Sequence, residues 1–393
     1  MNRRTFLKQS AVAALAASAA AAADAPARTY RVGVIGRTGH GDYGHGLDIA
    51  WAALPQTKVV AVADDAPAGL AAAAKRLGVD RAYADYREML DRERPDIVAI
   101  SQRWIDRHAE MAVAAAERGI HIFIEKPLCR SPAEADAILA ACEKSGARLA
   151  IAHPTRYSPR VEAVRRLIAE GKLGRVLEYR LRGKEDQRGG AEDLWVLGTH
   201  MLDLLHALAG RPASCFARVT LGGRPVTKAD VADGREGLGP LAGDAVHAQY
   251  AWPDGTVAYF DSVRDGARGK QPRYGLWIYG TEGVVEIQEG MMPDVYALME
   301  PSWSAARGGA AWQPVTAAGI GMPEPLKGPS HADRHTRVLL DLLASIEAKR
   351  EPAGGIRAGR EVVEMIAAVF ESHRQGRPVP LPLETRVNPL TLL

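Results

Sequence analysis

The sequence predicts two folded domains: an N-terminal doubly wound α/β domain with a parallel sheet, and a C-terminal α+β domain with a mainly antiparallel sheet. Up to residue 152, short β-branched runs alternate with alanine-rich helical stretches, a pattern typical of α/β domains. Beyond that point, strand-like runs follow one another with short turns, which favours antiparallel pairing. The chain of 393 residues is long enough for two independent cores. We expect the domains to span 28–152 and 153–393.

Continuous apolar strands separated by helices indicate that the first sheet is covered on both faces. The strands are expected at residues 31–36, 58–63, 96–100, 120–124 and 148–152. The helices between and after them are expected at residues 46–54, 66–77, 108–119 and 132–146.

The pattern changes after Pro154, where strands begin to follow strands. Helices are expected at residues 161–170, 199–209, 331–349 and 359–373. Strands are expected at residues 176–181, 213–221, 245–252, 256–263, 274–279 and 284–288, and residues 378–382 are expected to be extended. The Gly-, Pro- and Ala-rich stretch 301–329 has no periodicity, and we interpret it as an ordered arm or surface excursion rather than a hinge.

Residues 1–27 have the pattern of a targeting segment. Arg3 and Arg4 precede Phe6 and Lys8, and an alanine-rich apolar run over 11–23 follows. That run is too short for stable membrane insertion. The segment resembles a twin-arginine signal peptide, which implies export of the folded protein, often with its cofactor bound, to the periplasm. An ordinary amphipathic N-terminal helix is the alternative.

The charge balance excludes some partners. Lys and Arg number 50 against 47 Asp and Glu, so the formal net charge is +3, and the chain has no long run of like charges. Such a balance gives no reason to expect nucleic acid as a partner, and it favours small molecules.

The cysteines and the C-terminal histidines do not predict a metal site. Cys129, Cys142 and Cys215 are sparse and unpaired in spacing, so we expect buried thiols rather than a disulfide framework or a metal site. His331 and His335 are spaced for one helix face, but two histidines give too few ligands for a metal. We therefore expect no metal.

A glycine-rich loop follows the first strand and precedes the first expected helix. Gly36, Gly39 and Gly41 would let backbone N–H groups approach a dinucleotide pyrophosphate closely. The loop departs from the usual GxGxxG spacing because Thr38 stands where the second glycine belongs. An unliganded loop is the alternative interpretation.

Asp64 ends the second strand, where a carboxylate can accept hydrogen bonds from an adenosine ribose. Asp65 follows it, and two acidic residues would repel a 2′-phosphate. The sequence therefore favours NAD over NADP as the cofactor. A solvated aspartate without a ligand is the alternative.

Several short motifs in order carry a family resemblance. They are the glycine turn, Asp64, the 101–108 loop, Glu125-Lys126-Pro127, Arg156-Tyr157 with Pro159, Gly174-Arg175-Val176 and Gly198-Thr199-His200 with Asp203. With these the chain resembles the Gfo/Idh/MocA oxidoreductases. The resemblance implies a Rossmann domain, a C-terminal domain often used for oligomerisation, and a sugar or polyol bound between them. We therefore expect a dimer or tetramer.

The resemblance also implies catalytic and cofactor-binding residues. Lys126 would lie beside the nicotinamide and bind the substrate hydroxyl, and His200 would be the acid/base partner. Ser101, His108 and Glu125, together with Lys126, would join the glycine loop and Asp64 in binding the cofactor. The alternatives are a lysine extended from a strand end and a histidine satisfied by backbone at a helix start.

Substrate contacts are assigned to four further residues. Arg156 and Tyr157 suit hydroxyl recognition, although they could instead brace the domain interface. Asp203 lies one helical turn after His200 and could orient its ring, or it could be an ordinary helix-face carboxylate. Trp195 lies near His200 in sequence and could stack on a sugar face.

One departure from the family pattern concerns proton transfer. The family usually carries an aspartate four residues before the catalytic histidine, and Val196 occupies that position. The candidates for a replacement are Asp193, Glu192, Tyr157 and Asp186, and spacing does not choose among them.

These observations predict an exported NAD-dependent oxidoreductase acting on a sugar, polyol or glycoside. Because free NAD is expected to be scarce in the periplasm, the cofactor would be retained and recycled. One alternative is an NAD-dependent glycosidase or lyase that acts through a transient keto-sugar. Another is a carbohydrate-binding protein that has lost its chemistry, a hypothesis motivated by Val196 and the altered glycine turn.

Overall fold

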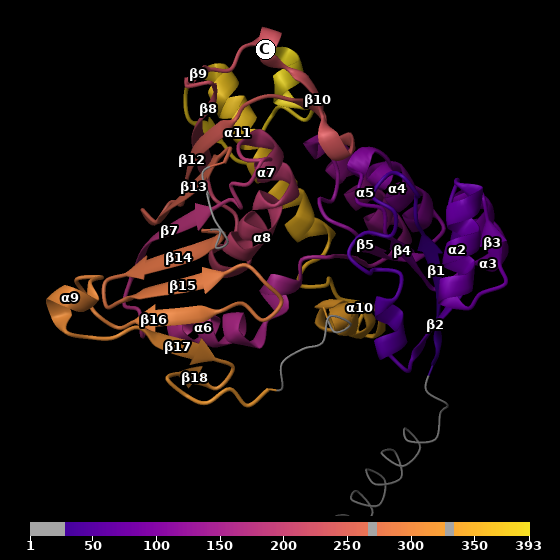
Figure 1. Ribbon diagram of the computed structural model, residues 1–393, viewed down its shortest axis with the longest axis horizontal. Helices are drawn as coiled ribbons and strands as arrows, with labels where there is room; N and C mark the ends of the chain where they lie inside the picture. The colour runs from indigo at the N-terminus through magenta and orange to yellow at the C-terminus, as the bar shows by residue number, and fades with distance from the viewer. Residues whose placement is uncertain (1–27, 266–272, 327–333) are drawn as a thin grey trace, which may run out of the picture.

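The computed structural model describes residues 28–265, 273–326 and 334–393, arranged as two domains (Figure 1). The predicted signal segment and His331 lie outside these residues. Within the described ranges, no helix has both the length and the apolar character needed to cross a bilayer.

The first domain has a parallel sheet with strand order β3-β2-β1-β4-β5-β6, so the predicted doubly wound fold is confirmed. Its strands are β1 (Tyr30–Ile35), β2 (Thr57–Ala63), β3 (Ala82–Tyr83), β4 (Ile97–Ile100), β5 (His121–Ile124) and β6 (Leu149–Ile151). Its helices are α2 (Pro67–Leu77), α3 (Tyr86–Glu93), α4 (His108–Glu117) and α5 (Pro132–Ser145). The short β3 and α3 were not predicted.

Local sequence explains where these helices begin and end. The Ser131 side chain accepts a hydrogen bond from the Glu134 N–H at the start of α5, and Pro132 occupies the first turn, where its missing N–H is harmless. Gly78 and Gly146 end α2 and α5 in the left-handed conformation, which glycine adopts at low cost.

The prediction of a helix at 46–54 is wrong. The chain forms turns there and only a short 3-10 helix over Ala50–Ala53. Gly41, Gly44 and Gly46 all have positive φ, and positive φ is incompatible with a right-handed helix. Gly41, the last glycine of the predicted phosphate loop, and the two glycines that follow it thus prevent the helix that usually comes after such a loop.

The C-terminal part of the chain covers the sheet face beside this irregular segment. Helix α10 (Thr336–Glu347) places Val338, Leu339 and Leu342 in one buried cluster with Val34 and Trp51. The first sheet is therefore covered on both faces, as predicted, but α10 comes from the opposite end of the sequence.

The second domain is built on a sheet in the order β18-β17-β16-β15-β14-β7-β13-β12-β8-β19, with β9 paired to β8. Among the described strands of this sheet, only β7 and β13 pair in parallel, so the predicted mainly antiparallel sheet is confirmed. Its strands are β7 (Val176–Arg182), β8 (Ser214–Leu221), β9 (Arg224–Pro225), β12 (Ala245–Ala251), β13 (Val257–Val263), β14 (Gly275–Gly280), β15 (Val284–Gln288), β16 (Val295–Leu298), β17 (Gln313–Thr316), β18 (Gly319–Ile320) and β19 (Val379–Pro380). A separate hairpin pairs β10 (Ala232–Gly234) with β11 (Gly239–Leu241).

Helices cover one face of this sheet (Figure 1). They are α6 (Pro159–Ala169), α7 (Ala191–Val196), α8 (Gly198–Ala209) and α11 (Ile356–Gln375). Helix α11 packs against β8 and α8 of the second domain and against α5 of the first, so it joins the two domains. In the arm predicted to be ordered, the described residues include α9 (Ala305–Gly308) and β17, which extends the main sheet.

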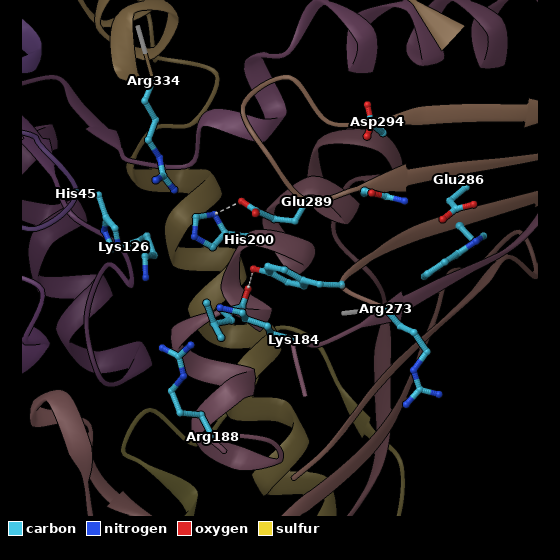
Figure 2. A pocket seen from close by; sticks show the side chains of 14 residues that line it. His45, Lys126, Lys184, Arg188, His200, Arg273, Glu286, Glu289, Asp294 and Arg334 are labelled. Atoms are coloured by element: carbon cyan, nitrogen blue, oxygen red, sulfur yellow. Dashed lines mark hydrogen bonds and ion pairs between the residues drawn. The ribbon is translucent and has the colours of Figure 1, made fainter. Parts of the chain in front are cut away.

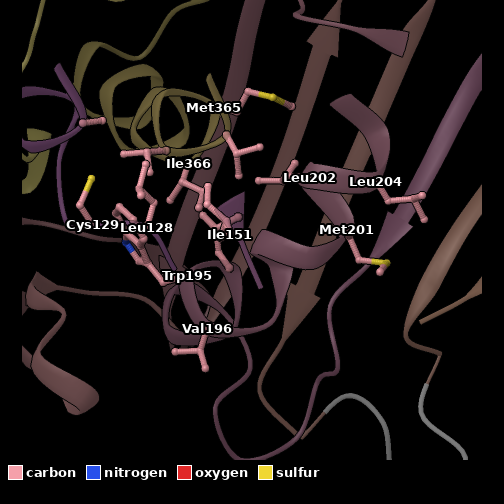
Figure 3. Close-up of a cluster of buried hydrophobic side chains, with 14 of the residues drawn as sticks. Leu128, Cys129, Ile151, Trp195, Val196, Met201, Leu202, Leu204, Met365 and Ile366 are labelled. Carbon is pink, nitrogen blue, oxygen red and sulfur yellow. The ribbon is translucent and has the colours of Figure 1, made fainter. Parts of the chain in front are cut away.

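Trp195, which was predicted to contact the substrate, lies in the hydrophobic core. Trp195 is only 2% exposed and belongs to the buried cluster that includes Leu128, Ile151 and Met201; Figure 3 shows it among these apolar side chains. It therefore has no surface to offer a sugar. The three cysteines are free and buried, as predicted.

Candidate active site

A cavity of about 780 Å³ lies where the two domains meet. His45 and Lys126 come from the first domain and His200 from α8, while Glu289 follows β15 and Arg334 precedes α10; Figure 2 shows these side chains around one space. Polar groups that converge in a concave site between domains are typical of a small-molecule site.

Lys126 directly follows β5 and reaches across the domain boundary. Its Nζ donates a hydrogen bond of 3.0 Å to the Val196 carbonyl oxygen at the end of α7, and the residue is 5% exposed. Burial lowers the pKa of Lys126, and the neighbouring Glu125 charge opposes that shift. The Lys126 ammonium is therefore held in a fixed position, and it loses its proton more readily than an exposed lysine does.

Glu125 positions a histidine that sequence reasoning missed. Its Oε1 accepts a hydrogen bond of 3.2 Å from the His45 N–H and contacts His45 Nδ1, while Oε2 accepts one of 2.6 Å from the Lys126 N–H. Burial alone would raise the pKa of Glu125, but the hydrogen bond from His45 and the charge of Lys126 lower it to about 2. The Gly44-His45-Gly46 sequence was the available signal, because a histidine between glycines in this loop has little structural role of its own.

His200 lies in the first turn of α8 and is 5% exposed. Its ring packs edge-on against His153, with centroids 5.3 Å apart. Burial and the nearby Lys126 and His153 hold the pKa of His200 well below its ordinary value. The imidazole is therefore neutral at pH 7, the form that can take a proton from a hydroxyl.

The carboxylate nearest to His200 is Glu289, whose Oε1 lies 4.0 Å from His200 Nδ1 (Figure 2). Burial raises the pKa of Glu289, while the charges of Arg334 and Lys126 oppose the shift. Glu289 is therefore the carboxylate among the described residues that lies beside the His200 ring, at a distance longer than a hydrogen bond, and it is the candidate for the group that Val196 replaces. Its only sequence signal is its position directly after a predicted strand, so spacing could not identify it.

The four residues predicted as possible replacements for the missing aspartate do not lie beside His200. The Asp193 Oδ2 accepts hydrogen bonds from Ser262 Oγ and the Glu185 N–H, and Asp186 forms a two-bond ion pair with Arg188. Tyr157 Oη donates to Asp341, 3.0 Å away, and Glu192 lines a different cavity beside β10. None of them reaches the His200 ring.

Arg156, Tyr157 and Asp203 brace the domain junction instead of facing the cavity. The Arg156 guanidinium donates a 2.9 Å hydrogen bond to Asp203 Oδ1, and His153 Nδ1 lies 3.4 Å from the same oxygen. Tyr157 accepts a hydrogen bond from the Gly354 N–H. Asp203 is thus paired with Arg156 and lies near His153, so it does not orient His200. Such pairing is what allows a charge to be buried.

The glycine loop forms a tight hairpin in which Arg37 and Asp42 pair. A Cβ on Gly36 would lie 2.2 Å from the Tyr43 ring, so the position requires glycine. Asp64 is 2% exposed, and its carboxylate accepts hydrogen bonds from the Thr38 hydroxyl, the Tyr43 hydroxyl and the Ala66 N–H. Asp64 therefore holds the loop together rather than offering free lone pairs to a ribose.

A second cavity, of about 200 Å³, lies at the carboxyl ends of β1 and β2, the place where a parallel α/β sheet binds nucleotides. Gly36, Asp65, Arg107 and Met111 are among its lining residues. The side chain of Asp65 is 48% exposed, so it is the accessible carboxylate for ribose hydroxyls. The lining combines apolar side chains with acidic residues and with Arg37, Arg87 and Arg107, and its position fits the adenosine end of NAD.

Ser101 and His108, which were predicted to bind the cofactor, contact the protein backbone instead. The Ser101 N–H donates to the Ile35 carbonyl and continues the β1–β4 pairing. His108 is fully buried, with Nδ1 2.8 Å from the Pro127 carbonyl and Nε2 2.8 Å from the Gln102 carbonyl. Burial lowers its pKa, and because both neighbours are carbonyl oxygens, a neutral ring can donate a hydrogen bond to only one of them. His108 thus lies between the Gln102 loop and the segment after Lys126 and lines neither of the two cavities.

Metal binding finds no support in the described part of the chain. No group of three or more His, Cys, Asp or Glu side chains there is arranged to hold an ion.

The fold and the two cavities together define a two-domain, NAD-binding oxidoreductase. The chain belongs to the Gfo/Idh/MocA family: residues 30–153 match the model for its NAD-binding Rossmann fold, and residues 165–381 match the model for its C-terminal alpha/beta domain. The resemblance stated from the motifs is thereby confirmed, and the family identifies NAD as the cofactor.

Similar proteins include several sugar dehydrogenases. Levoglucosan dehydrogenase of Pseudarthrobacter phenanthrenivorans is 28% identical over 290 residues, which cover 64% of this chain and 72% of that protein. D-apiose dehydrogenase of Paraburkholderia graminis is 30% identical over 186 residues, which cover 43% of this chain and 48% of that protein.

Solved structures share the fold. Levoglucosan dehydrogenase in complex with NADH and levoglucosan superposes with a TM-score of 0.72 at 24% identity, covering 91% of this chain and 100% of that one. Aldose-aldose oxidoreductase from Caulobacter crescentus gives a TM-score of 0.69 at 21% identity, covering 90% and 100%.

Replacing Glu289 tests its assignment beside His200. We expect Glu289→Gln to lower kcat by about tenfold to 100-fold, with a smaller change in KM, because the imidazolium loses a nearby negative charge. The same loss lowers the pKa of His200, so the acid limb of the kcat/KM profile moves to lower pH. Glu282→Gln, at an exposed turn before β15, is the matched control. Equal activity and equal pH profiles in the two variants would contradict the assignment.

Proposed function

We propose that this protein is an NAD-dependent oxidoreductase that transfers a hydride to or from a sugar, polyol or glycoside. The observation that carries the proposal is the meeting of Lys126 and His200, from different domains, in one cavity. The sequence similarity to levoglucosan and D-apiose dehydrogenases supports a carbohydrate substrate.

The residues divide the chemistry between charge stabilisation and proton transfer. When bound, NAD accepts or donates the hydride. Lys126 lies where its ammonium can stabilise the alkoxide that forms on the substrate oxygen. The neutral His200 takes the hydroxyl proton in oxidation and returns it in reduction, with Glu289 stabilising the imidazolium.

Lys126→Met tests the catalytic part of this proposal. The variant keeps the length of the side chain but removes the charge, so we expect turnover to fall by about 100-fold or more, while NAD still binds in the β1–β2 cavity. Absorbance at 340 nm measures turnover, and calorimetry measures NAD binding. Unchanged turnover would remove Lys126 from the mechanism. A wild-type protein that binds sugars but never reduces NAD would instead support the carbohydrate-binding alternative.

The proposal includes export by the twin-arginine pathway and a retained cofactor. The support is the Arg3-Arg4 segment and the cost of losing NAD outside the cytoplasm. We expect protein purified from the periplasm without added nucleotide to release near-stoichiometric NAD when it is denatured, as identified by mass spectrometry. An empty exported protein would contradict retention.

Self-association is also part of the proposal. The sheet face opposite α8 and α11 exposes Phe216 and Tyr296, and large exposed apolar groups on a sheet are typical of interfaces. Assembly through this face would give a dimer or tetramer.

A second candidate function is a glycosidase or lyase that acts through a transient keto-sugar. The pairing of His45 with Glu125 favours it, because a second imidazole in the cavity could remove the C–H proton that a neighbouring ketone acidifies. Incubation in D2O should then place deuterium on that carbon during glycoside cleavage. Cleavage without deuterium incorporation, or no cleavage of any glycoside, would leave simple oxidoreduction as the function.

A further inference from the structure

The cavity between the domains carries an excess of positive charge. Lys126, Lys184, Arg188 and Arg334 all line it, along with His45 and His200, and in Figure 2 the Arg334 guanidinium extends into the space beside His200 and Glu289. A neutral sugar would leave much of this charge without a partner.

Most of the cations near the cavity are balanced by neighbouring acids, but two are not. Arg188 and Lys184 share Asp186, at 2.6 and 3.7 Å. Among the described residues, neither Lys126 nor Arg334 forms an ion pair within 4.0 Å of a carboxylate; Lys126 has only the neutral Val196 carbonyl.

The acids in the lining do not cancel this excess. Glu289 lies beside the His200 ring. The Asp294 side chain is 64% exposed and lies 3.4 Å from Arg160. Glu286 alternates with the inward-facing Ile287 along β15 and pairs across the sheet with Trp277, so it faces away from His200. Glu289 and the buried Glu125 next to Lys126 are the anions at the reacting centre, and no acid among the described residues forms an ion pair within 4.0 Å of Arg334.

We propose that the substrate is a carboxylate-bearing sugar, an aldonate or a uronate, and that Arg334 binds its carboxylate. The inference rests on the proposed oxidoreductase function and specifies the substrate class of the same site. A planar guanidinium offers parallel N–H donors that match the two oxygens of one carboxylate. Lys126 then remains available for the hydroxyl that is oxidised.

The position of Arg334 fits this division. It precedes α10 and lines the cavity, and in Figure 2 its side chain and that of Lys126 extend toward the His200 ring from different segments. An elongated ligand can therefore place its reacting hydroxyl at Lys126 and His200 and its carboxylate at Arg334.

Calorimetry on the full chain loaded with NAD tests the proposal with matched probes. The pairs are D-glucuronate with D-glucose, D-galacturonate with D-galactose and D-gluconate with sorbitol, and D-glucose 6-phosphate is added as a second anion. We expect at least one acid to bind about tenfold to 100-fold tighter than its neutral partner. Rising salt concentration should weaken the acid more than the neutral sugar.

Variants assign the effect to Arg334. Arg334→Gln should abolish the preference for the acid, and Arg334→Lys should retain part of it because the charge remains but the fork is lost. Lys75→Gln, at an exposed position on α2, removes the same charge and should keep the full preference. Melting temperatures check that each variant is folded.

Several outcomes would overturn the inference. They are equal or tighter binding of every neutral partner, no measurable binding of any acid, a preference that survives in Arg334→Gln, or a preference for the phosphate over all carboxylates. Reduction of NAD by neutral sugars alongside any of these would leave the proposed oxidoreductase function standing. No reduction of NAD by either class would count against the function itself.

Discussion

The hydrogen bond from the Lys126 ammonium to the Val196 carbonyl is the contact on which the site depends. It joins the end of a strand in the first domain to the α7–α8 junction of the second, so the reacting lysine has its position only when both domains are in place. The same junction sets His200 at the start of α8. Lys126 and His200 are both buried there, and burial strengthens the electrostatic interactions between charged groups.

Several ionisable groups are buried around this contact, and most of them are paired with a group that balances their charge. Asp203 is paired with Arg156 and lies near His153, and Glu125 is held by His45 and the Lys126 backbone. Because removing one partner would leave an uncompensated buried charge, these pairs restrict how the domains can move. Lys126 and His200 are left with lowered pKa values, and groups with shifted pKa values are typical of catalytic sites.

The fold was largely predictable from the sequence because hydrophobic periodicity and glycine punctuation are local signals. The prediction of a helix at 46–54 failed because Gly41, Gly44 and Gly46, all with positive φ, override the apolar pattern. The substrate side of the site was less predictable, since it depends on contacts between distant segments. Trp195 and Asp203 lie near His200 in sequence but are absorbed by the core and by Arg156, whereas Glu289 and Arg334 reach the cavity from strands and helices far along the chain. A motif can fix Lys126 and His200, but only the packing of the two domains reveals which carboxylate and which arginine face them.

The central claim is that Lys126 and His200 act on one carbon–oxygen bond from which a hydride passes to NAD. Its most direct test is to incubate the purified full chain with NAD and a panel of carbon-deuterated sugars and sugar acids, and to analyse the nicotinamide by mass spectrometry. The account predicts NADH that carries one deuterium at C4 of the ring, and none in Lys126→Met. Reduced nicotinamide without deuterium, or no reduction with any member of the panel, would contradict it.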